Sequence, residues 1–207
     1  MIATARFGLL ALIGSTALLP LAIAQRRDGE TLRPASAFAT IVDRRTRSAA
    51  IFTEMGKVLT SPRCLNCHPR SDSPTQGDAM KLHRPAVTRG PDGMGVPGME
   101  CTVCHGPRNA PFATGKGTVP GNWKWHLAPK SMAWQGLTLG QICAAIKDPK
   151  KNGGLTLEKL IEHNGKDELV GWGWDPGAGR KPAPGTQAEF GELTKAWVES
   201  GAVCPKR

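Results

Sequence analysis

Apolar residues recur at intervals of three or four positions in four stretches of this 207-residue chain. This spacing places them on one face of a helix, so each stretch predicts an amphipathic helix. The predicted helices cover residues 41–61, 138–149, 156–165 and 186–201, with these apolar faces: Ile51, Phe52, Met55, Val58 and Leu59; Leu139, Ile142, Cys143 and Ile146; Leu157, Leu160 and Ile161; and Phe190, Leu193 and Trp197.

Capping signals mark the ends of these helices. Thr138 with Gln141, and Thr186 with Glu189, have the spacing of a capping box, and Thr156 is a cap residue for the short third helix. Pro62 and Pro149 follow the first and second helices, where a proline ends a helical pattern.

Two long stretches, residues 69–97 and 106–136, show neither helical nor alternating patterns. Loops of that length indicate disorder or a functional role. A large apolar cofactor gives a third account, because loops wrapped around it need not bury one another. The chain has no Tyr and only five Phe, but 25 Gly and 17 Pro, which fits that account. We therefore expect a mostly α fold with extensive irregular loops, forming one domain over residues 41–207 after a flexible leader at 25–40.

The N-terminus has the pattern of a secretory signal peptide over residues 1–24. A single charge at Arg6 precedes an apolar stretch, which ends in the small-x-small triplet at 22–24. The alternative is an uncleaved membrane anchor, but the stretch is short and contains Gly14 and Pro20. We expect cleavage after Ala24, export to the periplasm, and no stable membrane insertion afterwards.

Two Cys-x-x-Cys-His motifs carry the chemistry, at residues 64–68 and 101–105. Two thiols at this spacing can add to the vinyl groups along one edge of a haem, and the adjoining His lies under the iron as its proximal ligand. A Cys₄ zinc site and two disulfides are the alternatives, although zinc does not require the two His residues. The motifs therefore predict two covalent haems c, attached at Cys64, Cys67, Cys101 and Cys104 and ligated by His68 and His105.

With these motifs the chain resembles the multihaem cytochromes c of bacterial periplasms. It also resembles the small dihaem subunits that carry electrons for periplasmic molybdenum hydroxylases of the isoquinoline-oxidising type. The narrower resemblance rests on four short matches: residues 83–85 (His-Arg-Pro), 125–129 (Trp-His-Leu-Ala-Pro), 147–149 (Lys-Asp-Pro) and 172–174 (Trp-Gly-Trp). It implies a multihaem cytochrome c-like fold and electron transfer between a periplasmic oxidoreductase and the respiratory chain.

The distal iron ligands are sought among the remaining His and Met residues. His83 lies in the loop between the motifs, and His126 lies in an apolar run that could cover a haem. We expect these two to complete bis-His ligation, which lowers the reduction potential. His163, at a helix end, and Met132 are the alternatives.

The two spare cysteines, Cys143 and Cys204, predict a disulfide in an oxidising compartment, with a Cys-ligated haem as the alternative. The formal charge of +10 favours docking to acidic redox partners, such as a molybdenum hydroxylase subunit. Nucleic acid is disfavoured because the Lys and Arg residues are scattered. The competing function is a haem enzyme, peroxidase-like or acting on sulfur compounds, with one open or Cys-ligated iron.

Overall fold

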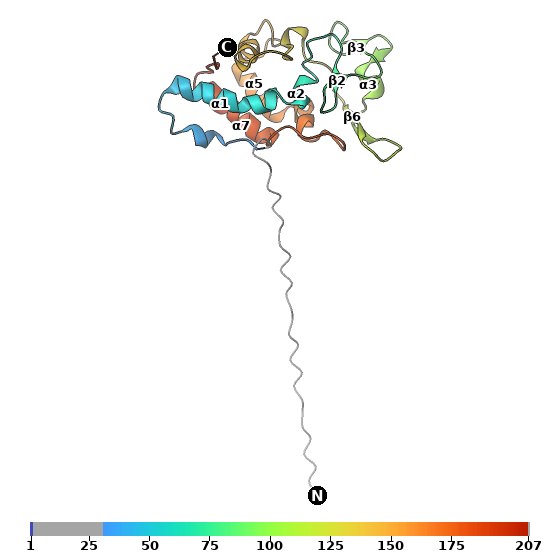
Figure 1. Ribbon diagram of the computed structural model, residues 1–207, viewed down its shortest axis with the longest axis horizontal. Helices are drawn as coiled ribbons and strands as arrows, with labels where there is room; N and C mark the ends of the chain where they lie inside the picture. The colour runs from blue at the N-terminus through green and yellow to red at the C-terminus, as the bar shows by residue number, and fades with distance from the viewer. Residues whose placement is uncertain (2–30, 207) are drawn as a thin grey trace.

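The computed structural model describes Met1 and residues 31–206; the predicted signal peptide lies outside the described residues. Helices dominate the regular structure, as expected, and the rest is loops and short hairpins (Figure 1). The helices are α1 (Arg44–Leu59), α2 (Pro62–Leu65), α3 (Cys101–Cys104), α4 (Leu139–Lys147), α5 (Leu157–Lys166), α6 (Glu168–Gly171) and α7 (Gln187–Glu199), with 3₁₀ turns η2 (Ala35–Phe38), η3 (Lys130–Met132) and η4 (Trp172–Trp174).

The four long helices gather in one half of the molecule, where α7 packs against both α5 and α1, and α4 packs on α1. Their apolar faces meet in one core, which has Phe52, Met55, Ile142 and Trp197 fully buried at its centre. The helical periodicity of the sequence is thus confirmed. No helix within residues 31–206 is both long and apolar enough to cross a bilayer.

The predicted caps are present at the starts of three helices. Thr138 and Thr186 each form a complete capping box, and the Thr156 hydroxyl accepts from the backbone N–H of Lys159. The first helix begins later than predicted, at Arg44 instead of residue 41. Its cap is Asp43, whose carboxylate accepts from the backbone N–H of Thr46.

Three antiparallel hairpins lie in or next to the stretches expected to be irregular, and no strand pattern predicted them. They pair β1 (Thr75–Gln76) with β2 (Lys81–Leu82), β3 (Gly95–Val96) with β4 (Met99–Glu100), and β5 (Arg108–Pro111) with β6 (Thr118–Asn122). In the second hairpin Val96 pairs with Met99 across Pro97 and Gly98. Gly98 has φ of 80°, the left-handed conformation that the third position of a Pro-Gly type II turn requires.

The segment 31–40, expected to belong to a flexible leader, packs against the helical half. Phe38 is 1% exposed and Leu32 is 7% exposed, and both belong to the core. Arg33 pairs with the buried carboxylate of Glu54 on α1. Leu32 and Phe38 show neither helical nor alternating spacing with other apolar residues, so the sequence did not predict that they belong to the core.

The predicted disulfide between Cys143 and Cys204 is formed. It joins α4 to the C-terminal tail. The tail is also held by a hydrogen bond, which the Trp197 indole N–H donates to the carbonyl of Val203. Because the two sulfurs bond each other, neither is a free thiolate that could ligate iron.

Candidate cofactor site

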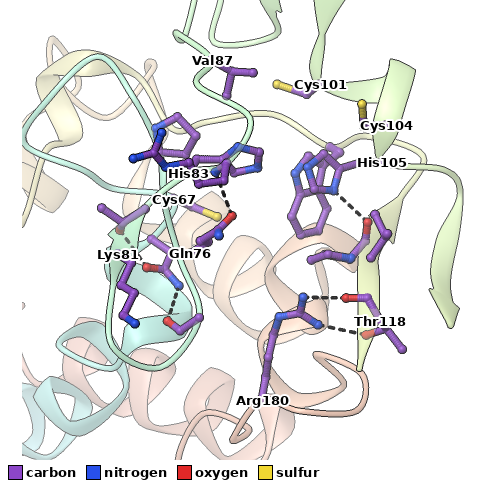
Figure 2. A pocket seen from close by; sticks show the side chains of 18 of the residues that line it. Cys67, Gln76, Lys81, His83, Val87, Cys101, Cys104, His105, Thr118 and Arg180 are labelled. Carbon is purple, nitrogen blue, oxygen red and sulfur yellow. Dashed lines mark hydrogen bonds between the residues drawn. The ribbon is translucent and has the colours of Figure 1, made fainter. Parts of the chain in front are cut away.

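A cavity of about 900 Å³ lies among the hairpins and is lined in part by residues of α2 and of the turn after it (Figure 2). Its volume is within the range of small-molecule and cofactor sites. Most of the predicted site residues line it: Cys67, His83, Cys101, Cys104, His105 and His126.

The second motif is presented to this cavity by two hairpins. The β3–β4 hairpin leads directly into the short helix α3, which carries Cys101 and Cys104, and the β5–β6 hairpin follows. The chain becomes extended at His105, with φ of −95° and ψ of 94°. His105 is 9% exposed, and in Figure 2 it lies just below the two sulfur atoms.

One hydrogen bond fixes the tautomer of the His105 ring. Its Nδ1 lies 2.8 Å from the carbonyl oxygen of Pro120, on β6. A carbonyl can only accept, so Nδ1 carries the proton and Nε2 keeps its lone pair. Metal-ligating histidines in proteins are commonly held in this way, with the other ring nitrogen donating to a backbone carbonyl.

His83 lies beside His105 in the same cavity. The two ring centroids are 5.9 Å apart, with the rings tilted by 58°, and Figure 2 shows the rings on opposite sides of the upper cavity. The Nδ1 of His83 is 2.9 Å from the carbonyl oxygen of Pro85, so its Nε2 also keeps a lone pair. Two imidazoles thus offer ligand nitrogens within one pocket.

Two tryptophan rings pack at the His105 imidazole, one directly and one through the other. Trp125 stacks on it with centroids 4.7 Å apart, and Trp172 meets Trp125 edge-on at 4.8 Å. The Trp172 indole N–H donates to Asn109, on β5. Trp125 and Trp172 both line the cavity.

The first motif is less open to the cavity. Cys67 lines the cavity wall, but Cys64 packs against the hydrophobic core, and neither Cys64 nor His68 is among the lining residues. The His68 ring is stacked on Trp134 at 3.5 Å, and its Nδ1 lies 2.7 Å from the carbonyl oxygen of Met132. His68 therefore has the same two supports as His105, a carbonyl at Nδ1 and a stacked indole.

The remaining ligand candidates occupy distinct places. His126 lines the cavity, with its Nδ1 bonded to the carbonyl of Lys124. Met132 has its side chain buried in the core, so it contributes to the site through its carbonyl and not through sulfur. His163, on α5, lies outside the cavity lining, and burial is the main cause of its lowered pKa.

Burial keeps the groups of the first motif neutral. It lowers the pKa of His68 to about 4, and it raises the pKa of Cys64 to about 12 and that of Cys67 to about 11. All four motif cysteines are free thiols, so the alternative with two disulfides is not formed. Within residues 31–206, no three or more His, Cys, Asp or Glu side chains come together as a metal-binding group.

The donor set of the second motif fits a covalent haem. It combines two thiols at the required spacing, an adjoining imidazole with a free Nε2, a second imidazole beside it, and a cavity of cofactor size. The first motif supplies the same thiols and imidazole, with Cys67 on the wall of that cavity.

Two parts of the site had no strong signal in the sequence. The carbonyls that orient His68 and His105 belong to residues far along the chain, and a carbonyl is not encoded by residue type. Arg63, which also lines the cavity, directly precedes Cys64, and its position beside the motif was the available clue. No protein-family model, curated protein or solved structure matches this chain.

Proposed function

We propose that this protein is an exported electron carrier with two haems c, attached at Cys64 and Cys67 and at Cys101 and Cys104. The observation that carries the proposal is the pairing of His83 with His105 in a cavity that also holds Cys101 and Cys104. The haem iron supplies one-electron chemistry. The chain supplies the ligands and fixes their tautomers through the carbonyls of Pro85 and Pro120.

An electron carrier fits this site better than an enzyme. In a haem enzyme one ligand position of the iron stays open for substrate. Here two imidazoles of the chain, those of His83 and His105, lie close together at the second motif. The alternative Cys ligand is engaged in the Cys143–Cys204 disulfide. His83 and His105 would thus hold the iron of the second haem. His68 would hold the iron of the first, with His126 as its proposed second imidazole and His163, which acts on the pKa of His68, as the alternative.

Electrons can enter or leave without a substrate channel. Cys104 is exposed, and Val103, between the two thiols, is 68% exposed, so a haem attached at Cys101 and Cys104 would have that edge at the surface. Cys67 and Cys101 line one cavity, which brings the two attachment sites close enough for exchange between haems. The net charge of +10 favours an acidic protein partner, such as an oxidoreductase subunit.

The test is expression with a c-type haem maturation system, followed by mass spectrometry and electron paramagnetic resonance of the oxidised protein. We expect a mass increased by two haems and two low-spin irons with bis-imidazole signals. His83→Ala should convert one iron to high spin with both haems still attached, and His126→Ala should do the same to the other.

Two results would count against this assignment. A high-spin iron in the unsubstituted protein would favour the enzyme, and a mass without haem would remove the proposal. His163→Ala tests the alternative ligand of the first haem, since the pKa of His68 is lowered by burial and, to a smaller extent, by His163. Both irons should stay low-spin in this variant, and a high-spin iron would assign His163 in place of His126.

A further inference from the structure

A buried guanidinium on the cavity wall lacks part of its hydrogen bonding. The side chain of Arg63, on α2, is 1% exposed. Its Nη2 donates to Asp78 at 2.6 Å, but its Nε and Nη1 are buried without a hydrogen-bond partner. A buried charge with unsatisfied donors is costly, so this arrangement points to a further anionic group in the cavity.

The charges around Arg63 leave the cavity short of negative charge. Arg180 lines the same cavity, and it donates to Thr118 and to the carbonyl of Pro176. Asp78 is 42% exposed and is shared, because it also accepts from the backbone N–H of Lys181. Two guanidiniums thus face one carboxylate that is partly in solvent. Trp172 lies under Arg63, with the guanidinium carbon 5.8 Å from the ring centroid, and gives it no hydrogen bond.

The positions of these groups match the two ends of a haem. In Figure 2, the sulfurs of Cys101 and Cys104 lie at one end of the cavity and Arg180 lies at the other, with His83 and His105 between them. A haem joined through its vinyl groups at one edge carries its two propionates on the opposite edge. Guanidinium groups are the side chains that bind carboxylates best.

We propose that Arg63 and Arg180 form a carboxylate subsite, which takes a propionate of the haem attached at Cys101 and Cys104; this rests on the proposed function. The subsite keeps that propionate ionised inside the protein and adds positive charge near one iron. It thereby raises the reduction potential of the second haem relative to a site without Arg63, since reduction removes a positive charge from the iron.

The test uses the haem-loaded protein with Arg63→Gln, Arg63→Lys and Arg180→Gln. Lys116→Gln is the matched control, because Lys116 is an exposed cation on the lining of the same cavity. Midpoint potentials are measured by spectroelectrochemistry, and the propionates, labelled with ¹³C at the carboxylate, are followed by redox-difference infrared spectroscopy. Haem count and paramagnetic resonance show whether attachment and ligation are kept.

We expect Arg63→Gln to lower one of the two midpoint potentials and to shift a labelled carboxylate band, with both haems attached and low-spin. Arg63→Lys should restore part of the potential, and Lys116→Gln should change little. If Arg63→Gln does not mature, Arg180→Gln carries the test, with a shift in the same potential and band expected.

Unchanged potentials and bands in variants that hold two low-spin haems would overturn the subsite and leave the electron-carrier proposal standing. A potential that responds to added acetate or phosphate, with the labelled bands unmoved, would also overturn it, because a free anion would then occupy the subsite. Absence of haem from the unsubstituted protein would remove both proposals.

Discussion

A single buried carboxylate joins the segment before α1 to that helix. Glu54 is 4% exposed; it accepts from the backbone N–H of Arg33 at 3.0 Å and pairs with Lys57 at 2.6 Å. Burial is the largest influence and would raise the pKa of Glu54, but the hydrogen bonds from Lys57 and Arg33 together outweigh it. The pKa therefore lies below its ordinary value of 4.5, and the fold favours the ionised form.

Glu54→Gln should lower the free energy of unfolding at pH 7 by about 1–3 kcal/mol, because it removes charge-assisted hydrogen bonds. A depressed pKa gives stability that is present above the unfolded-state pKa and lost as pH falls through the folded-state pKa. Urea unfolding between about pH 6 and pH 3 should therefore show a steeper loss of stability for the unsubstituted protein than for the variant. Parallel pH profiles would show that Glu54 is not the group responsible.

At the residue scale, the sequence predicted the groups of the site better than their partners. The motifs marked His68 and His105 directly, since residue type and spacing define them. The carbonyls that hold these rings, on Met132 and Pro120, could not be predicted, because any residue has one. Nor could spacing decide that His83 approaches His105, since the intervening chain is looped.

At the scale of elements, α5 and α7 approach each other closely at two glycines. A Cβ added to Gly191 would lie 2.6 Å from the Cα of Gly165, and one added to Gly165 would lie 3.0 Å from the Cα of Gly191. Both atoms met are backbone, so neither can move aside without shifting a helix. Next to this contact, the Asn164 side chain donates to Thr194, which ties the same two helices together.

Gly191→Ala should destabilise the protein by about 1–3 kcal/mol, although alanine favours helices, because overpacking separates α5 from α7. Gly173→Ala is the matched control: a Cβ there would lie 3.6 Å from the Cβ of Arg63, an ordinary contact. Thermal unfolding of the two variants checks the difference. A stabilised Gly191→Ala variant would mean that helix propensity, and not the crossing, decides at this position.

The success of sequence prediction differed between kinds of element. The sequence predicted helices α4, α5 and α7 correctly for two reasons. Apolar residues recur at helical spacing along each of them, and a cap residue marks where each begins. The hairpins were missed because strands of two residues, such as β3 and β4, are too short to show alternation. Their positions depend on turns and on the cavity they enclose, and a pattern along the chain does not record either.

At the scale of the whole molecule, the core of long helices and the cavity of the second motif lie in different halves. The long helices lie in one half of the molecule and the hairpins in the other (Figure 1). The disulfide belongs to the helical half, and the hairpins line the cavity. The α2 segment connects them, since Cys64 packs on the core and Cys67 faces the cavity. The sequence predicted the attachment sites and the disulfide, but not this division, which results from long-range packing.

That division predicts that the disulfide can be removed at a cost in stability and with no effect on the site. Cys143 and Cys204 are separated by 61 residues, and release of a loop of that size costs about 4 kcal/mol in the chain-entropy description. Replacing both by Ala should therefore lower the free energy of unfolding by about 2–4 kcal/mol. The single variant Cys204→Ala loses the same cross-link and should be destabilised about as much.

Midpoint potentials and electron paramagnetic resonance signals of the double variant should equal those of the unsubstituted protein, because the cross-link lies in the helical half. Altered signals would instead show that the C-terminal tail is coupled to the haem sites.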